Sequence, residues 1–531
     1  MKLSLHPLSI IHCQLSIILF LGCQSPTTDR FIPLSVLGGY VEKFNAEDNE
    51  LFATHIPNSA SFDFLSVNIP RFECPDKQME EIYYFRWWTY RKHIRQTPEG
   101  FIITEFLPDV PWAGKYNAIS CAGMHHFNEG RWLHDSKYLH DYAYFWLKKG
   151  GSVRSYSFPI ACSLYNQYTV TGKDSVIRDL LPDLVANFEA WEKVRYDASR
   201  GLFWQIDDRD GMEMSVCGSG FRATINAYMS AEAKAIAHIA QLAQHPEANK
   251  FFDKSAQVQT NMLKTLWDEE AGFFKVLSRN ENAQLCDARE QHGYTPWCFN
   301  LVDDVKYARA WKFLMDPLHF YAPYGPTTAE QCHHGFRISY EGHECQWNGP
   351  SWPFSTSVTL TGLANLLNTQ KQDYISKDDY LNLLQIYTKS HYLTRDDGTV
   401  VPWIDENINP FTGDWISRTR LKTWENGHWS KGKGGIERGK DYNHSTYCDL
   451  IISGLIGIRP QTDNTMIVNP LVPDMGWDYF CLEDVMVHGK RITVLYDKTG
   501  TKYKQGKGLF LFVDGKIKAS APTLSKLKCN L

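Results

Sequence analysis

The feature that most constrains the fold is a long series of segments in which apolar residues recur at helical spacing. The first follows Asp76, a suitable N-cap, and includes Met79, Ile82 and Phe85 at intervals of three residues. Loops of unequal length, rich in Trp, Gly, Asp and Glu, separate these segments. The series predicts a helical barrel whose loops at one end form a pocket. Further helices are expected at 132–149, 153–170, 174–195, 221–243, 250–267, 303–315, 352–369, 378–393 and 442–457.

The pattern changes on both sides of this helical region, which we assign to residues 76–460. Residues 24–75 contain short alternating pieces such as Ser61–Val67, so we expect a β-rich N-terminal region there. After Pro460, short apolar runs separated by Gly, Asp and Lys turns predict a small antiparallel β module over 461–531. A chain of 531 residues has room for one large helical domain and such a module.

Residues 1–23 are interpreted as an export signal. Leu15–Leu21 is an apolar run too short to cross a bilayer, and it ends at Gly22-Cys23 before a polar stretch. This arrangement resembles a bacterial lipobox with Cys23 as the lipidated residue. We therefore expect an exported lipoprotein of the bacterial periplasm or outer membrane, held at the membrane only by this anchor. The alternative is a misassigned start codon that adds residues without function.

Composition narrows the classes of partner. The net charge of -5 provides no basic surface for nucleic acid. Many of the 17 Trp stand beside Gly, Pro, Asn or Asp, and aromatic rings in polar clefts stack well on sugar rings. We therefore expect an oligosaccharide or glycoside as the partner. His343 and the pair His333-His334 are not at convincing ligand spacing, so we expect no metal and no cofactor.

Cysteine usage favours free thiols. The 13 Cys are odd in number, irregularly spaced and without a Cys-x-x-Cys pair. This pattern argues against a disulfide framework or a zinc ribbon. Buried free thiols are the expected state of most of them.

The first stretch that indicates chemistry is Trp204–Ser215, which holds four acids and an Arg just before a strong helix. Helix-capping acids in a solvated loop would explain one or two of them. They would not explain why Glu213 lies between Met212 and Met214. A carboxyl held against apolar side chains has a raised pKa, as a general acid requires.

Two further stretches frame candidate pocket residues. In Val401–Trp415, Glu406 follows another acid and lies between Trp403 and the final Trp, although Asn and Asp also suit a surface turn. In His343–Pro353, two Trp flank Asn-Gly-Pro like a pocket wall, although Pro353 would also suit the first turn of a helix.

These three stretches together resemble motifs of glycoside hydrolase families 37 (trehalases) and 63 (α-glucosidases and mannosylglycerate hydrolases). Arg209–Glu213 is similar to their acid loop, but Glu213 stands where those families have Asp, and Asp210 is the alternative acid. Gln346–Pro353 is similar to a Trp-Arg-Gly-Pro-x-Trp run, and Glu406–Gly413 to the Glu-x-x-x-Pro-x-Thr-Gly run that holds the general base. The motifs occur in the expected order over about residues 200–450, whereas the large N-terminal β-sandwich of family 63 has no counterpart.

The resemblance implies an (α/α)6 barrel and inverting, exo-acting hydrolysis of an α-glucoside or related α-glycoside. Glu213 would be the general acid and Glu406 the general base, with their carboxyls about 6.5–9.5 Å apart. We expect substrate contacts from residues of the three stretches and of other aromatic or polar segments, several of which suit core packing equally well. These residues are Trp88, Arg91, Trp112, Asp210, Trp297, Gln346, Trp347, Trp352, Trp403 and His444.

Two other classes of function stay open at this stage. A polysaccharide lyase or a phosphorylase could use the same fold, and His125, His126 or His444 could serve a lyase. A non-catalytic, carbohydrate-binding surface lipoprotein could use the same Trp residues. A binding protein has no need of two carboxyls on opposite walls of a pocket, so the Glu213–Glu406 pair favours the hydrolase.

Overall fold

The computed structural model describes residues 31–280, 282–424 and 433–531. The predicted export signal, residues 1–23, and Cys23 lie outside the described residues. Residues 31–531 form one compact unit.

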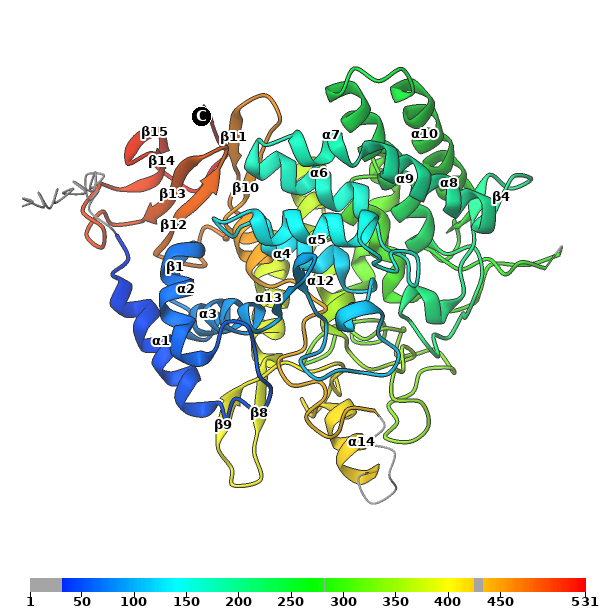
Figure 1. The fold of residues 1–531 in the computed structure, drawn as a ribbon, viewed down its shortest axis with the longest axis horizontal. Helices are drawn as coiled ribbons and strands as arrows, with labels where there is room; N and C mark the ends of the chain where they lie inside the picture. The colour runs from blue at the N-terminus through cyan, green and yellow to red at the C-terminus, as the bar shows by residue number, and fades with distance from the viewer. Residues whose placement is uncertain (1–30, 281, 425–432) are drawn as a thin grey trace, which may run out of the picture. The chain divides into compact units, whose positions relative to one another are not determined.

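The centre of this unit is the predicted (α/α)6 barrel, in which inner helices are backed by outer ones. α9 (Ala223–Leu242) is buried on nearly every side, as is α12 (Pro353–Thr369), so both are inner helices. α10 (Ala248–Thr265) packs against α9 through one face only and is an outer helix. The other α-helices described between residues 76 and 460, most of them labelled in Figure 1, are α3 (Lys77–Lys92), α4 (Gly123–Gly130), α5 (Lys137–Lys148), α6 (Ile160–Thr171), α7 (Ser175–Asp179), α8 (Leu181–Arg195), α11 (Thr295–Cys298), α13 (Lys377–Ser390) and α14 (Ile416–Trp424).

The predicted C-terminal β module consists of two antiparallel sheets. β12 (Tyr479–Val487), β13 (Lys490–Asp497), β14 (Gly508–Val513) and β15 (Lys516–Ala521) pair in sequence order. Asp514 and Gly515 both have positive φ, as a tight hairpin between β14 and β15 requires. The second sheet contains β10 (Ile458–Pro460), β11 (Thr465–Val468) and β16 (Leu527–Asn530).

The prediction of a β-rich N-terminal region is wrong for its described part, residues 31–75. This part forms α1 (Leu34–Glu47), α2 (Ser61–Asn68) and a single short strand, β1 (Arg71–Glu73). The apparent alternation in Ser61–Val67 is helical, because Ser61, Leu65 and Asn68 are buried at helical spacing while Phe62 is exposed. β1 pairs with β12, so the N-terminal region completes the C-terminal sheet.

Some predicted helices are shorter or of another type. The segment 303–315 forms a run of 3-10 turns, η5 (Val305–Phe313), and 442–457 is helical only near its end, with a π-helical run at Leu450–Leu455. That late start has a clear cause: the buried Glu129 carboxylate accepts the backbone N–H groups of Tyr447, Cys448 and Asp449 and so caps the helix there.

The expectation of free thiols needs one correction. Cys217 and Cys286 form a disulfide that joins the acid-rich loop to the segment before Glu290. Their spacing of 69 residues left no local signal in the sequence. Within the described part of the chain, no helix has the length and apolar character needed to cross a bilayer.

Candidate active site

A cavity of about 300 Å³ lies among the loops that precede the inner helices. We call the stretch Trp204–Ser215 the acid loop and the stretch His343–Pro353 the wall loop. The backbone N–H of Trp347 donates to the carbonyl of Glu213 at 3.1 Å, which joins these two loops. Ser351 and Ile408 exchange two backbone hydrogen bonds of 3.0 Å. These bonds join the wall loop to the stretch Val401–Trp415, which we call the base loop. The three sequence stretches therefore meet at one place, and Glu213 and Glu406 line the same cavity.

Asp210 fixes the acid loop through hydrogen bonds to residues outside the cavity. The Asp210 carboxylate is buried and accepts from Ser157 Oγ at 2.6 Å, from Arg222 Nε at 2.7 Å and from the Thr224 hydroxyl. Gly211 follows with a φ of +70°, and a Cβ there would lie 2.4 Å from Cys121 Sγ. Asp210 does not line the cavity, so its role is to position the loop that carries Glu213.

Burial in the cavity raises the pKa of Glu213 to about 8, and the charge of Asp208 adds to this effect. The shift is in the direction expected from the sequence, but its cause is different. Met212 is buried, whereas Met214 is 52% exposed, so the flanking Met residues do not enclose the carboxyl on both sides. Among the described residues, Glu213 has no cationic partner that would favour its ionised form.

Glu406 is bound on both of its oxygens. Arg438 Nε donates to Oε1 at 2.6 Å, and the Cys345 thiol lies 3.8 Å from Oε2. Both members of the Arg438–Glu406 ion pair are almost fully buried. The arrangement holds the carboxyl in one orientation, and among the described residues the donor to Oε2 is the weakly donating thiol of Cys345.

Aromatic rings form one wall of the cavity, and they include three Trp residues named in the sequence analysis, Trp112, Trp347 and Trp352. The rings of Trp347 and Trp352 stack with centroids 4.4 Å apart. The ring centroids of His444 and Tyr442 lie 3.9 Å apart, and both ring nitrogens of His444 are buried with no hydrogen-bond partner in the described part of the chain. Trp112 also lines the cavity and is the most exposed of these rings, at 37%.

Five predicted substrate-binding residues do not line the cavity, in addition to Asp210. The Trp88 ring is in the core beside Phe85, and Arg91 donates to the Ile56 carbonyl and to Asn58. Their shared helix face points to the N-terminal region, because α1 packs against α3 there. The remaining three also make contacts away from the cavity. Trp297 packs edge-on against Trp311, the Gln346 amide donates to the Glu341 carbonyl, and the Arg418 guanidinium lies over the Trp403 ring.

Sequence reasoning missed several lining residues. Glu105 is a buried carboxyl that accepts a hydrogen bond from the Tyr442 hydroxyl, and burial raises its pKa to about 8. One signal was available: an acid in the apolar run Ile102–Leu107. Lys433 contacts Glu344 at 2.6 Å. The other lining residues without a predicted role are Phe106, Ile119, Cys121, Tyr156, Asp208, Arg209, Gly211, His343, Cys345, Phe354 and Arg438.

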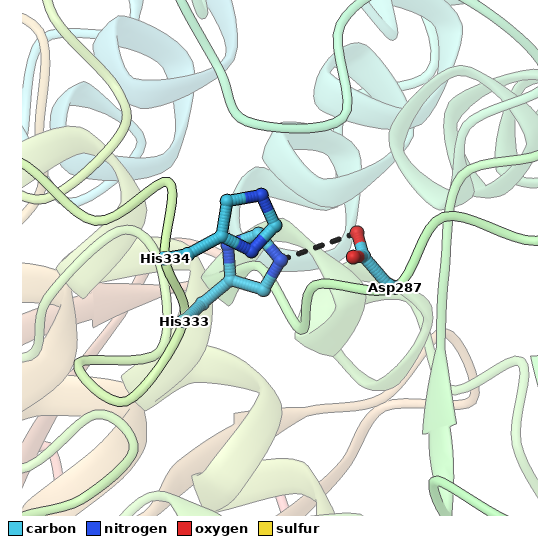
Figure 2. Close-up of side chains that lie close together, drawn as sticks. All are labelled: Asp287, His333 and His334. Carbon is cyan, nitrogen blue, oxygen red and sulfur yellow. Dashed lines mark ion pairs between the residues drawn. The ribbon is translucent and has the colours of Figure 1, made fainter.

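Among the residues that the structure describes, two groups of side chains have the composition of a metal site, and both lie outside the cavity. In the first, His333 Nε2 is 3.1 Å from Asp287 Oδ1, and His334 stacks nearby (Figure 2). His333 Nδ1 accepts the Gly335 N–H, so this ring nitrogen is already in use, and Nε2 is in ion-pair contact with Asp287. In the second, Glu330 already binds Arg289 with both oxygens. Both groups fit hydrogen-bonded clusters better than metal sites.

The helical barrel and its acid-lined loop cavity have the architecture of the (α/α)6 class of glycoside hydrolase domains. Residues 115–445 match the family described as mannosylglycerate hydrolase MGH1-like glycoside hydrolase domain, and the chain belongs to this family. Residues 458–518 match the C-terminal domain of glycosyl hydrolase family 65. The resemblance to glycosidases of this barrel class, which the loop motifs predicted, is confirmed.

Solved structures show the same fold. A protein described as "Sialidase" is 38% identical, with a TM-score of 0.86 over 94% of this chain and 45% of that one. The chain thus spans less than half the length of that relative. A GH78 family rhamnosidase of Bacillus sp. GL1 is 12% identical, with a TM-score of 0.53 over 81% and 40% of the two chains. An uncharacterized conserved protein from Thermus thermophilus is 13% identical, with a TM-score of 0.50 over 70% and 100%.

Proposed function

We propose that this glycosidase is an inverting, exo-acting enzyme that hydrolyses an α-glucoside or a related α-glycoside. The observation that carries the proposal is the pairing, in one cavity, of a carboxyl with a raised pKa and a second carboxyl bound by an arginine. Inverting hydrolysis needs one protonated acid and one ionised base. Glu213 has the environment of the first and Glu406 that of the second.

In this mechanism Glu213 donates its proton to the glycosidic oxygen as the bond to the anomeric carbon breaks. Glu406 accepts a proton from a water molecule, whose oxygen attacks the anomeric carbon from the opposite face of the ring. The leaving group departs as an alcohol, and the new hydroxyl has the inverted configuration. Arg438 donates to Glu406 Oε1 and so orients the carboxylate for this step.

The size and lining of the cavity support exo action. Its volume is near the lower end of the roughly 300–1,000 Å³ that is usual for ligand sites, which suits a terminal sugar unit better than an internal stretch of polymer. The stacked Trp347 and Trp352 provide an apolar wall, and the exposed ring of Trp112 is available to a second sugar unit.

The name of the 38% identical relative suggests a second substrate class, sialosides. A sialic acid carries a carboxylate, and the cavity already contains five carboxyl side chains. The Arg and Lys side chains that line it are each paired with one of these carboxyls: Arg438 with Glu406, Lys433 with Glu344 and Arg209 with Asp208. The charge of the cavity therefore favours a neutral sugar.

The proposal is tested by incubating the purified protein with 4-nitrophenyl α-glucoside, α-mannoside, α-rhamnoside and α-sialoside and with α-linked disaccharides. We expect turnover of a neutral α-glycoside, and proton NMR should show first the β-anomer of the sugar. Glu213→Gln and Glu406→Ala should each lower kcat by at least about 10³-fold. Retention of wild-type turnover by both variants, or release of the α-anomer, would contradict the mechanism. Binding of sugars without turnover would favour the non-catalytic alternative.

We also propose that the protein is exported and anchored through Cys23. The Cys217–Cys286 disulfide supports an oxidising compartment. Expression of the full chain in a bacterium, followed by membrane fractionation, should place it in the membrane fraction. Cys23→Ala should release it into the soluble fraction, and an unchanged distribution would overturn the anchor.

A further inference from the structure

Glu105 is, like Glu213, a carboxyl of the cavity without a cationic partner among the described residues. It follows β3 (Gly100–Ile103) and is 5% exposed. Its Oε1 accepts the hydroxyl of Tyr442, whereas its Oε2 is buried and has no hydrogen-bond partner among residues 31–280, 282–424 and 433–531. A buried polar atom without a partner is costly, so its presence in a cavity indicates that a ligand completes it.

The surroundings of Glu105 favour its neutral form. Burial raises its pKa to about 8, and the charge of Glu406 contributes to the shift. The nearby Arg438 is already bound to Glu406. A neutral carboxylic acid has both a donor and an acceptor, which matches the two hydrogen-bonding roles of a sugar hydroxyl. Because Tyr442 occupies Oε1, the free oxygen has a fixed direction.

We propose that Glu105 determines glycone specificity by binding a ring hydroxyl of the sugar in the cavity, and that it thereby selects a neutral sugar over an acidic one. The inference rests on the proposed glycosidase function and names its substrate class more closely. A sugar carboxylate in this cavity would lie among Glu105, Glu213 and Glu406, and the resulting repulsion and desolvation would oppose its binding. A hydroxyl in the same place completes the hydrogen bonds of Glu105.

The test compares 4-nitrophenyl α-glucoside with its 2-, 3-, 4- and 6-deoxy analogues and with the α-glucuronide. In the wild type, kcat/KM for one deoxy analogue should be lower than for the parent sugar by about 10- to 100-fold. In Glu105→Ala this preference should fall to within about 3-fold while the other three preferences persist. The glucuronide should be the poorest substrate of the wild type.

Three further variants complete the design. Glu105→Gln keeps the volume and part of the hydrogen bonding, so it should retain an intermediate preference. Tyr442→Phe should behave in the same way, because it frees Oε1 without removing the carboxyl. Asp109→Asn changes an exposed carboxyl of the same loop that pairs with Arg95, and it should match the wild type. Melting temperatures identify any variant that fails to fold.

Either of two kinetic results would overturn the inference. One is a Glu105→Ala variant that lowers kcat/KM equally for the parent and every deoxy analogue. The other is hydrolysis of the glucuronide at least as fast as the glucoside. If the wild type turns over none of these glycosides, the Kd values of glucose, mannose and glucuronate, measured by calorimetry, test the Glu105 inference separately from the hydrolase proposal. Neutral sugars that bind more tightly than glucuronate, and lose that advantage in Glu105→Ala, support Glu105 while the hydrolase proposal fails. Absence of neutral-sugar binding to the wild type overturns the Glu105 inference as well.

Discussion

Arg438 Nε lies 2.6 Å from Glu406 Oε1, and this ion pair joins the base loop to the segment that follows residue 433. Both side chains are nearly inaccessible to solvent. Such a pair resists screening by salt and fixes the orientation of its carboxylate. It also makes the proposed base depend on a residue 32 positions away in the chain.

Replacement of Arg438 should therefore affect catalysis and stability together. Arg438→Ala leaves the Glu406 charge buried without its partner, which costs about 3–5 kcal/mol of unfolding free energy. The value of kcat should fall by roughly 10²-fold as well, because the carboxylate loses the donor that fixes its orientation. Arg438→Lys should show an intermediate effect. Steady-state kinetics measured below the melting temperature check this, and an unchanged kcat in Arg438→Ala would contradict it.

Glu213 should control the basic limb of the pH profile. Its pKa of about 8 means that the protonated form predominates at neutral pH and is lost as the pH rises through 8. In Glu213→Gln the basic limb should disappear. The loss of kcat should also be smaller for aryl glycosides whose leaving group needs no protonation, such as 2,4-dinitrophenyl glycosides. Equal loss for good and poor leaving groups would argue against a general acid at this position.

Asp210 provides the matched comparison, because it lies three residues from Glu213 and binds Arg222 rather than facing the cavity. Asp210→Asn should lower the unfolding free energy by about 3–5 kcal/mol, and it should keep the basic limb and the normal leaving-group dependence. A melting curve and a pH–rate profile on the same sample separate the two roles. Loss of the basic limb in Asp210→Asn would instead identify Asp210 as the acid.

The barrel could be predicted because each of its helices is encoded by a pattern within one continuous stretch of sequence. Helical spacing of apolar residues identified α3, α9, α10, α12 and α13 to within a few residues. The three loop motifs are also continuous stretches of sequence, and their order placed them in one catalytic domain. The β strands after Pro460 were predictable for the same reason, since short apolar runs and turn residues alternate there.

The partners within the site could not be predicted, because they come from distant parts of the chain. Glu105 and Tyr442 are 337 residues apart, and no periodicity connects them. Linear neighbours were also misleading, since Met214 points to solvent beside Glu213. Residue type alone did not separate core from cavity either: Trp297 lies in the core, whereas Trp347 lines the cavity.

Glu232 should make stability depend on pH without taking part in catalysis. This carboxyl of α9 is buried, and burial raises its pKa to about 8, above the unfolded value of about 4.3. The folded state therefore keeps a proton that the unfolded state releases. The associated stability is present below pH 4.3 and falls as the pH rises through 8. Glu232→Gln lacks this pH-dependent loss. Between pH 4.5 and 8 the free energy of unfolding of the variant should therefore rise relative to the wild type by on the order of 3 kcal/mol.

Melting temperatures of the wild type and Glu232→Gln at pH 5 and pH 8.5 measure this effect. Glu189→Gln, on the surface of α8, serves as the control and should show no pH-dependent difference. An equal difference between wild type and Glu232→Gln at the two pH values would show that Glu232 is ionised in the folded protein at both.

The Cys217–Cys286 disulfide should stabilise the acid loop in particular. It closes a loop of 69 residues, and loop-closure entropy for that length corresponds to about 4 kcal/mol. Val216, next to Cys217, donates its backbone N–H to Glu290 at 2.8 Å, so the disulfide and this hydrogen bond support the same segment directly after the acid loop.

Reduction, or replacement of both cysteines by Ser, should lower the melting temperature and also kcat, because Glu213 loses part of its support. Cys332→Ser, which changes an exposed free thiol, should do neither. If reduction lowered the melting temperature but left kcat unchanged below it, the bridge would stabilise the barrel without positioning Glu213.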